Sequence, residues 1–222
     1  MIFMVSGGTA THERYRETGY FGRLLTPRTG NSTKVIAEKK IVWAADNDAF
    51  KGFAPVAFVR FLGRIAGVPR CKFVAAPDVV CDADATLRKF KAWGPVIREL
   101  GLPVALVAQD GLRAYRWPLD GLVSPDSTRV GWNEFDALFI GGSTEWKESD
   151  AAKMLCLLAK REGKWLHMGR VNTLRRLRKA HAWGCDSVDG TSFSRWPDKF
   201  FHSAVRWARR LDAEAAAPGL FA

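Results

Sequence analysis

The sequence has few cysteines and no long apolar run, and these absences narrow the class of protein. Its four cysteines form no C-x-x-C pair and have no histidines near them at zinc-ligand spacing. A zinc site and a disulfide framework are therefore unsupported, and a reducing cytoplasm is the expected compartment. No apolar run is long enough to span a bilayer, and Met1–Val5 lacks the basic region of a signal peptide. We expect no membrane segment, no metal and no cofactor.

The chain is also short of acidic residues. It has 23 Asp and Glu against 34 Lys and Arg, which gives a formal net charge of +11. Such a surface attracts polyanions through its field and through counterion release, although a basic enzyme without a nucleic-acid partner is an alternative. Linkers and internal repeats are lacking. The 222 residues therefore predict one domain over residues 1–222, with 213–222 as a frayed tail.

What the sequence does contain is a series of short apolar runs that end in polar residues or glycine. Six of them are Ile41–Asp46, Lys72–Asp78, Val104–Gln109, Ala137–Gly142, Trp165–Gly169 and Cys185–Asp189. Two earlier runs, Ile2–Ser6 and the weaker Gly22–Thr26, make eight. Strands that alternate with helices predict a parallel sheet, and eight of them predict an α/β fold, a compact (β/α)8 TIM-like barrel. A barrel would collect the polar ends at one mouth, where such barrels carry their chemistry.

Helical periodicity fills the gaps between these runs. Helices are expected at Phe53–Ala66, Asp84–Leu100, Glu148–Arg161, Asn172–Trp183 and Pro197–Ala217. The segment Gly111–Phe135 lacks this periodicity, so we expect an irregular connection with a functional or lid role.

Acidic side chains stand at three of the strand ends. Asp189 ends the last run among small residues that a substrate could approach, although a loop or cap role fits equally well. Asp46 begins an Asp-Asn-Asp sequence, which is also typical of a turn. Asp78 has two more acids close behind it and could belong to a cation site.

Five cations with no acid among them lie on or just before one predicted helix. They are Arg170, Arg175, Arg176, Arg178 and Lys179. A solvated helix face is one interpretation, but surfaces that serve only solubility mix the two signs of charge. We therefore expect these residues to bind nucleic acid.

Taken in order, the strand ends resemble those of the tRNA-guanine transglycosylases, and more closely those of their DNA-acting relatives, the deoxypurine-in-DNA protein A family. The resemblance covers residues 41–195. The matching phrases are Asp46–Phe50 (DNDAF), Ala76–Asp78 (APD), Val107–Gly111 (VAQDG), Ile140–Gly142 (IGG), His167–Gly169 (HMG) and Cys185–Asp189 (CDSVD).

The resemblance implies a glycosyltransferase that replaces guanine in DNA with a 7-deazaguanine base through a covalent bond between an aspartate and deoxyribose. Asp189 resembles the nucleophile and Asp46 the general acid/base. The implied base-binding residues are Asp78, Gln109, Gly141, Gly142, Phe50, Met168 and Gly169. DNA and a free 7-deazaguanine base are the implied partners, in a bacterial cell or a phage-infected host where modified DNA evades restriction.

Two departures favour DNA over tRNA as the substrate. The chain lacks the zinc site of the tRNA enzymes, and it is much shorter than they are. The alternatives are an N-glycosylase or nucleoside hydrolase on the same barrel, a non-catalytic basic DNA-binding barrel, and a metal-dependent aldolase-like barrel.

Overall fold

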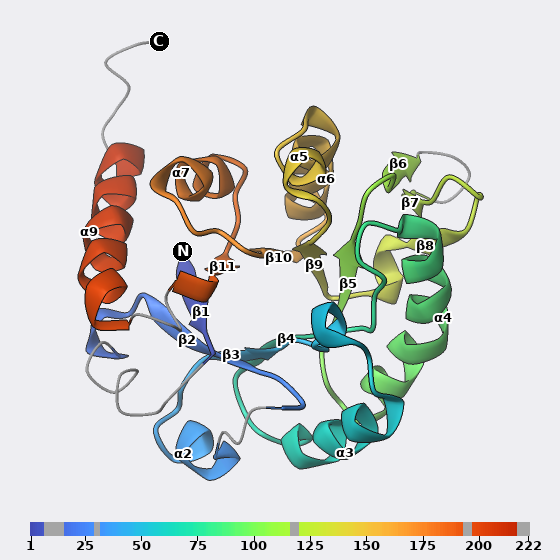
Figure 1. The fold of residues 1–222 in the computed structure, drawn as a ribbon, viewed down its shortest axis with the longest axis horizontal. Coiled ribbons are helices and arrows are strands. Elements are labelled where there is room, and N and C mark those ends of the chain that lie inside the picture. Colours follow the sequence, from blue (N-terminus) through green and yellow to red (C-terminus); the bar gives the residue numbers. More distant parts are fainter. Residues whose placement is uncertain (7–15, 29–31, 116–119, 193–196, 217–222) are drawn as a thin grey trace.

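The chain forms a closed barrel of eight parallel strands that alternate with helices (Figure 1). This computed structural model describes residues 1–6, 16–28, 32–115, 120–192 and 197–216. The barrel strands are β1 (Ile2–Val5), β2 (Phe21–Leu25), β3 (Trp43–Ala45), β4 (Cys71–Ala75), β5 (Val104–Ala108), β9 (Ala137–Ile140), β10 (Trp165–Met168) and β11 (Ser187–Asp189). The last strand, β11, pairs with β1 and closes the barrel. The predicted (β/α)8 barrel is confirmed.

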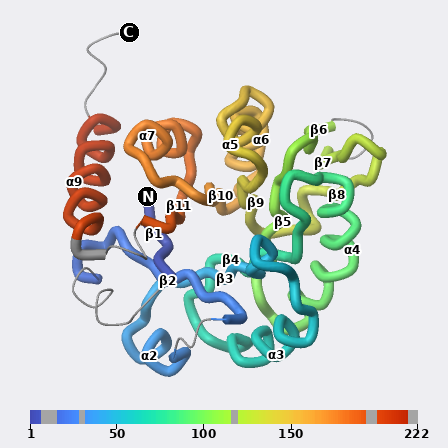
Figure 2. The backbone as a smooth tube through the Cα atoms, viewed as in Figure 1, coloured from blue at the N-terminus to red at the C-terminus, as the bar shows by residue number. Residues whose placement is uncertain are grey.

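The helices surround the strands (Figure 2). They are α2 (Thr33–Glu38), α3 (Pro55–Ile65), α4 (Ala83–Glu99), α5 (Thr144–Lys147), α6 (Asp150–Arg161), α7 (Leu174–Ala182) and α9 (Pro197–Ala216), with 3-10 turns at Arg16–Thr18, Ala49–Lys51 and Trp132–Glu134. The five predicted helices are present near their expected limits, whereas α2 and α5 were not predicted. Residues 213–216 belong to α9, and residues 217–222 lie outside the described part of the chain, so the frayed tail at 213–222 stays a prediction.

Five of these helices, α2, α4, α5, α6 and α7, begin at side chains that accept a backbone hydrogen bond. Asp82 caps α4, Ser149 caps α6 and Thr173 caps α7, and each accepts from the N–H three residues further along the chain. Such caps satisfy N–H groups that the first turn of a helix leaves without partners.

The segment after β5 is ordered differently from the prediction. It forms a small antiparallel sheet of β6 (Arg113–Tyr115), β7 (Gly121–Val123) and β8 (Arg129–Gly131). The expected irregular connection is therefore wrong, because strands of three residues are too short to show a clear alternation in the sequence. None of its described residues lines the cavity discussed below, so the structure gives no support to a lid role.

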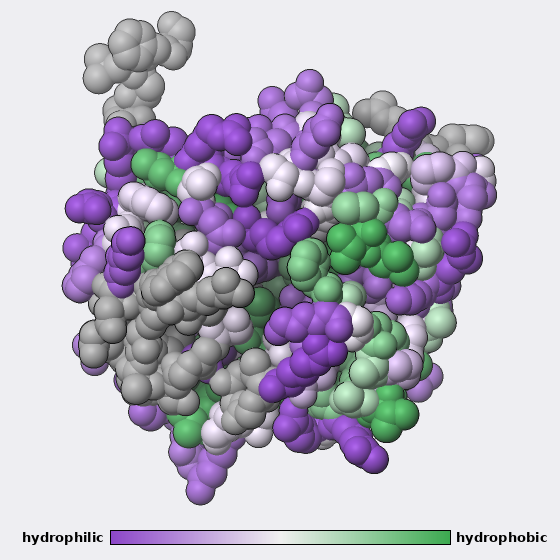
Figure 3. Space-filling view, in the orientation of Figure 1, coloured by the Kyte–Doolittle hydropathy of each residue, from purple (hydrophilic) through white to green (hydrophobic). Residues whose placement is uncertain are grey.

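Two apolar layers follow from the alternation of side chains along each barrel strand. Met4, Leu24, Ala44, Phe73, Ala75, Ala105, Val107, Ala137 and Phe139 form one buried cluster that fills the barrel. The neighbouring strand residues, such as Val5, Leu25, Val74 and Leu138, belong to a larger cluster packed against the helices. Polar side chains cover most of the face seen in Figure 3, with apolar ones in small groups. Because apolar side chains fill the barrel, the polar residues that follow the strands lie at its mouth.

Candidate active site

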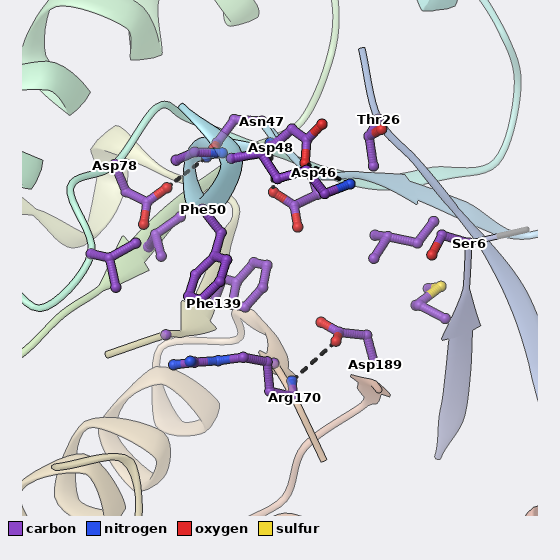
Figure 4. A pocket seen from close by; sticks show the side chains of 18 of the residues that line it. Ser6, Thr26, Asp46, Asn47, Asp48, Phe50, Asp78, Phe139, Arg170 and Asp189 are labelled. Atoms are coloured by element: carbon purple, nitrogen blue, oxygen red, sulfur yellow. Dashed lines mark hydrogen bonds and ion pairs between the residues drawn. The ribbon is translucent and has the colours of Figure 1, made fainter. Parts of the chain in front are cut away.

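A cavity of about 400 Å³ lies where the barrel strands end (Figure 4). Nine of the residues singled out in the sequence line it: Asp46, Phe50, Asp78, Gln109, Gly141, Gly142, Gly169, Arg170 and Asp189. They come from strand ends far apart in the sequence, and the closed sheet brings them to one mouth.

Asp46 follows β3 and points into this cavity (Figure 4). One of its oxygens, Oδ1, accepts a hydrogen bond of 3.0 Å from the backbone N–H of Asp48. Loss of hydration raises the pKa of Asp46 to about 7, and the negative charges of Asp189 and Asp78 act in the same direction. Near neutral pH this side chain can therefore either donate or accept a proton.

Asp78 is almost fully buried and is held by two amide side chains. Asn47 Nδ2 donates to Asp78 Oδ1 over 2.9 Å, and Gln109 Nε2 donates to Asp78 Oδ2 over 2.5 Å. Burial raises the pKa of Asp78, and these two hydrogen bonds oppose that effect. A carboxylate has about four acceptor positions, so the bonds to Asn47 and Gln109 do not use all of its capacity to accept. Asn47 was not predicted, although its place between two aspartates at a strand end was a signal.

Asp189 ends β11, and each of its carboxyl oxygens has a nitrogen within hydrogen-bond distance. The backbone N–H of Arg170 donates to Oδ1 over 3.0 Å, and His167 Nε2 lies 3.0 Å from Oδ2. His167 is completely buried, with its ring centroid 5.0 Å from that of Phe73 and 4.5 Å from that of Phe139. No separate role was predicted for His167 from the sequence.

Arg170, Phe50 and Gly142 form one wall of the cavity. The Arg170 guanidinium donates to the Gly142 carbonyl and lies 5.6 Å from the centroid of the Phe50 ring. Phe50 is 73% exposed, so much of its ring is accessible to a ligand. Gly142 has φ +74°, and a Cβ atom there would lie 2.6 Å from an oxygen of Asp110. Both the backbone conformation and the space therefore require glycine.

Lys147, for which no role was predicted from the sequence either, lies behind this wall. It is 1% exposed, does not line the cavity, and its Nζ donates to the carbonyl oxygen of Gly169 over 2.8 Å. Burial lowers the pKa of Lys147 to about 8, and the positive charge of Arg170 adds to this effect. A lysine with a lowered pKa is a potential nucleophile.

Met168 lies outside the cavity. It is 2% exposed and belongs to the apolar layer between the barrel and the helices. Its neighbour His167 points into the barrel, and successive residues of a strand point to opposite faces. The side chain of Met168 is therefore not placed to clamp a ligand in the cavity against Phe50.

The basic residues of α7 are paired with acids from other elements. Glu148 contacts Arg175 at 2.7 Å, Arg176 at 2.8 Å and Lys179 at 3.3 Å. These cations, Arg176 first, lower the pKa of Glu148 to about 2. The sequence has no acid among these cations, and the folded chain supplies one in Glu148, which follows α5. DNA binding by this cluster stays a prediction.

Among the residues that the structure describes, no group of three or more His, Cys, Asp or Glu could hold a metal ion. Within the same residues, every helix is too short or too polar to cross a bilayer.

The chain matches no family model and no curated protein sequence. It is similar in structure to a protein described as "Native KDPGal structure", with a TM-score of 0.58 and 12% sequence identity. The match covers 96% of this chain and 95% of the other. Because only 12% of the residues are identical, the likeness shows the fold of this chain and nothing more.

These findings overturn the expected family. The matched structure is described only in those words, and no comparison supports a DNA transglycosylase. The prediction of a glycosyltransferase that inserts 7-deazaguanine into DNA is wrong, and neither the N-glycosylase nor the DNA-binding alternative is supported. The physical reason is that any (β/α)8 barrel presents short polar or glycine-bearing phrases in order at its strand ends. The succession of such phrases therefore reflected the fold and not the family.

Proposed function

We propose that this protein is an enzyme that performs general acid–base chemistry on a small, flat, uncharged or cationic molecule. The observation that carries the proposal is the convergence of Asp46, Asp78 and Asp189 in one cavity, with the pKa of Asp46 raised to about 7. Perturbed acids in a cleft mark functional sites, and barrels of this fold carry their chemistry at this mouth.

The charge of the cavity supports this choice of substrate. The lining includes four carboxyl groups, those of Asp46, Asp48, Asp78 and Asp189, against two cations. An anionic ligand would meet repulsion, whereas adjacent N–H or O–H groups would find acceptors on Asp78. The exposed ring of Phe50 and the guanidinium of Arg170 offer flat surfaces to a flat ligand.

The roles of the two remaining carboxyl groups follow from their surroundings. Asp46 would transfer the proton, because its pKa near neutrality suits both directions of transfer. Asp189 would stabilise positive charge that develops on the substrate, because a donor at each oxygen holds it in place.

Three flat probes of equal size test the charge preference. Benzamidine is cationic, benzamide is neutral and benzoate is anionic. By calorimetry, benzamidine should bind more tightly than benzamide, and benzoate should not bind. Benzamidine binding should strengthen as pH rises through about 7, where Asp46 ionises, and lose this dependence in Asp46→Asn. Preferred binding of benzoate would refute the proposal.

Turnover can be sought by NMR with pools of neutral and cationic metabolites in deuterated water. Asp46→Asn and Asp189→Asn should abolish any chemical change or deuterium uptake. The matched control Arg60→Ala, on the exposed face of α3, should retain it. Activity that persists in both aspartate variants would exclude this site.

A second candidate is a carbonyl lyase that works through an imine, as lysine amines do with carbonyl substrates. Lys147 favours it, because its pKa is lowered to about 8 and it lies directly behind the cavity wall. Borohydride reduction in the presence of dihydroxyacetone, a neutral carbonyl compound, should then add mass at Lys147, and Lys147→Met should show none. An unmodified Lys147 would remove this candidate.

We also place the reaction in the cytoplasm. The proposal is supported by the four cysteines, all of which are free thiols. Cell fractionation with an antibody to the protein tests it.

A further inference from the structure

A chain of hydrogen bonds runs through the barrel to Asp189 and uses side chains that the proposed chemistry does not involve. Trp165 Nε1 lies 2.9 Å from Ser187 Oγ, and Ser187 Oγ lies 2.8 Å from His167 Nδ1. His167 Nε2 then lies 3.0 Å from Asp189 Oδ2. Ser187 and His167 are both completely buried.

The donor and the acceptor of each of these hydrogen bonds can be assigned. An indole N–H only donates, so Ser187 Oγ accepts from Trp165. The remaining described neighbour for the Ser187 hydroxyl proton is His167 Nδ1. Because a buried hydroxyl costs free energy unless it is hydrogen-bonded, that proton points to Nδ1, which must then be an acceptor. The ring proton therefore resides on Nε2, which faces the Asp189 carboxylate.

We propose that His167 is a positioning residue for Asp189, with its tautomer set by Ser187 and Trp165. The inference rests on the proposed function, because Asp189 is the carboxylate that the chemistry would use. His167 Nε2–H holds Oδ2, and the backbone N–H of Arg170 holds Oδ1. The two donors fix the plane of the carboxylate.

The surroundings of the ring suit this role. Phe73 and Phe139 contact it within the apolar interior of the barrel, and Phe139 also lines the cavity. The ring therefore has little freedom to turn, and the Nε2–H keeps its direction. A donor whose orientation is locked by packing supports a catalytic group without rearrangement during the reaction.

The tautomer can be measured without any ligand. Protein with ¹⁵N-labelled histidine should show His167 with a protonated Nε2 and an unprotonated Nδ1. Asp189→Asn should move the Nε2–H resonance, because a neutral oxygen replaces a charged acceptor, and Ser187→Ala should release the tautomer into a mixture. A protonated Nδ1, or a His167 signal that ignores Asp189→Asn, would overturn the proposal.

Two amide variants then separate positioning from packing. His167→Gln places an N–H near the position of Nε2, whereas His167→Asn places it near Nδ1. If the donor to Asp189 matters, benzamidine affinity should fall about tenfold in His167→Asn and stay within about twofold in His167→Gln. Equal losses in both variants, with both folded by circular dichroism, would overturn the positioning role.

The two proposals fail in different ways. A wild-type protein that binds none of the three probes, yet shows the expected tautomer and its response to Asp189→Asn, would refute the proposed function alone. Binding of benzamidine together with the wrong tautomer would refute the role of His167 alone.

Discussion

The ionisation of Asp46 should weaken the fold, and Asp46→Asn should reveal by how much. The pKa of Asp46 rises from 3.8 to about 7 in the folded chain, chiefly because the charged form loses hydration. A folded pKa above the unfolded one means that the folded state holds the proton more tightly. Stability therefore falls as pH rises from about 4 to about 7, and the full cost is present above that.

The magnitude follows from the difference between the two pKa values. Each pKa unit corresponds to about 1.4 kcal/mol, so the full cost is on the order of 4 kcal/mol. Asparagine keeps an oxygen for the N–H of Asp48 but carries no charge next to Asp189 and Asp78. The variant should therefore be more stable than the wild type at pH 8, and its advantage should shrink by about 2–3 kcal/mol at pH 5.

Urea unfolding followed by the fluorescence of the nine tryptophans measures this difference. The exposed Asp120→Asn serves as a matched control and should change stability equally at both pH values. An advantage of Asp46→Asn that is the same at pH 5 and pH 8 would refute the reasoning. So would a variant less stable than the wild type at pH 8.

Three further predictions concern the cavity wall and the ion pairs. Gly142→Ala should lower the free energy of unfolding by about 1–2 kcal/mol or more, because φ is +74° and the new methyl would lie 2.7 Å from Trp146. Calorimetry measures this destabilisation, and an unchanged Tm would contradict the prediction. Phe50→Ala should leave Tm nearly unchanged, since the ring is 73% exposed, but weaken benzamidine binding about fivefold; equal affinity would exclude the ring from the site. Glu148→Gln should lower the free energy of unfolding by about 1 kcal/mol at pH 7. This destabilisation should vanish as pH falls toward the folded pKa of about 2, where the wild-type carboxyl loses its bond to Arg176. Urea titrations should show a smaller difference between variant and wild type at pH 3 than at pH 7, and an equal difference would contradict the prediction.

The strand ends were the most predictable part of the site. A run such as Val104–Ala108 is fully buried, follows Pro103 and ends at the polar Gln109, so its place in a parallel sheet follows from composition and spacing. Once eight strands close, Asp46 and Asp189 must share a mouth. The pocket residues Gln109 and Gly142 were found for the same reason.

Other features depended on contacts that no local pattern encodes. Met168 and His167 are neighbours on one strand, and a register difference of one residue decides which of them faces inward. Glu148 pairs with Arg176 across 28 positions of sequence, so the cluster looked unpaired until the chain folded. The resemblance to the transglycosylases was carried by strand-end phrases, and these belong to the barrel fold.

The sequence by itself determined the alternation of strands and helices, the eight-stranded closure and the set of polar residues available at the mouth. Periodicity and turn residues act locally along the chain, so they can be recognised from the sequence alone. Tertiary structure alone decided the protonation of Asp46, the burial of Lys147 and the hydrogen bonds that hold Asp189. These properties depend on hydration and on charges brought together from distant segments, and both exist only in the folded chain.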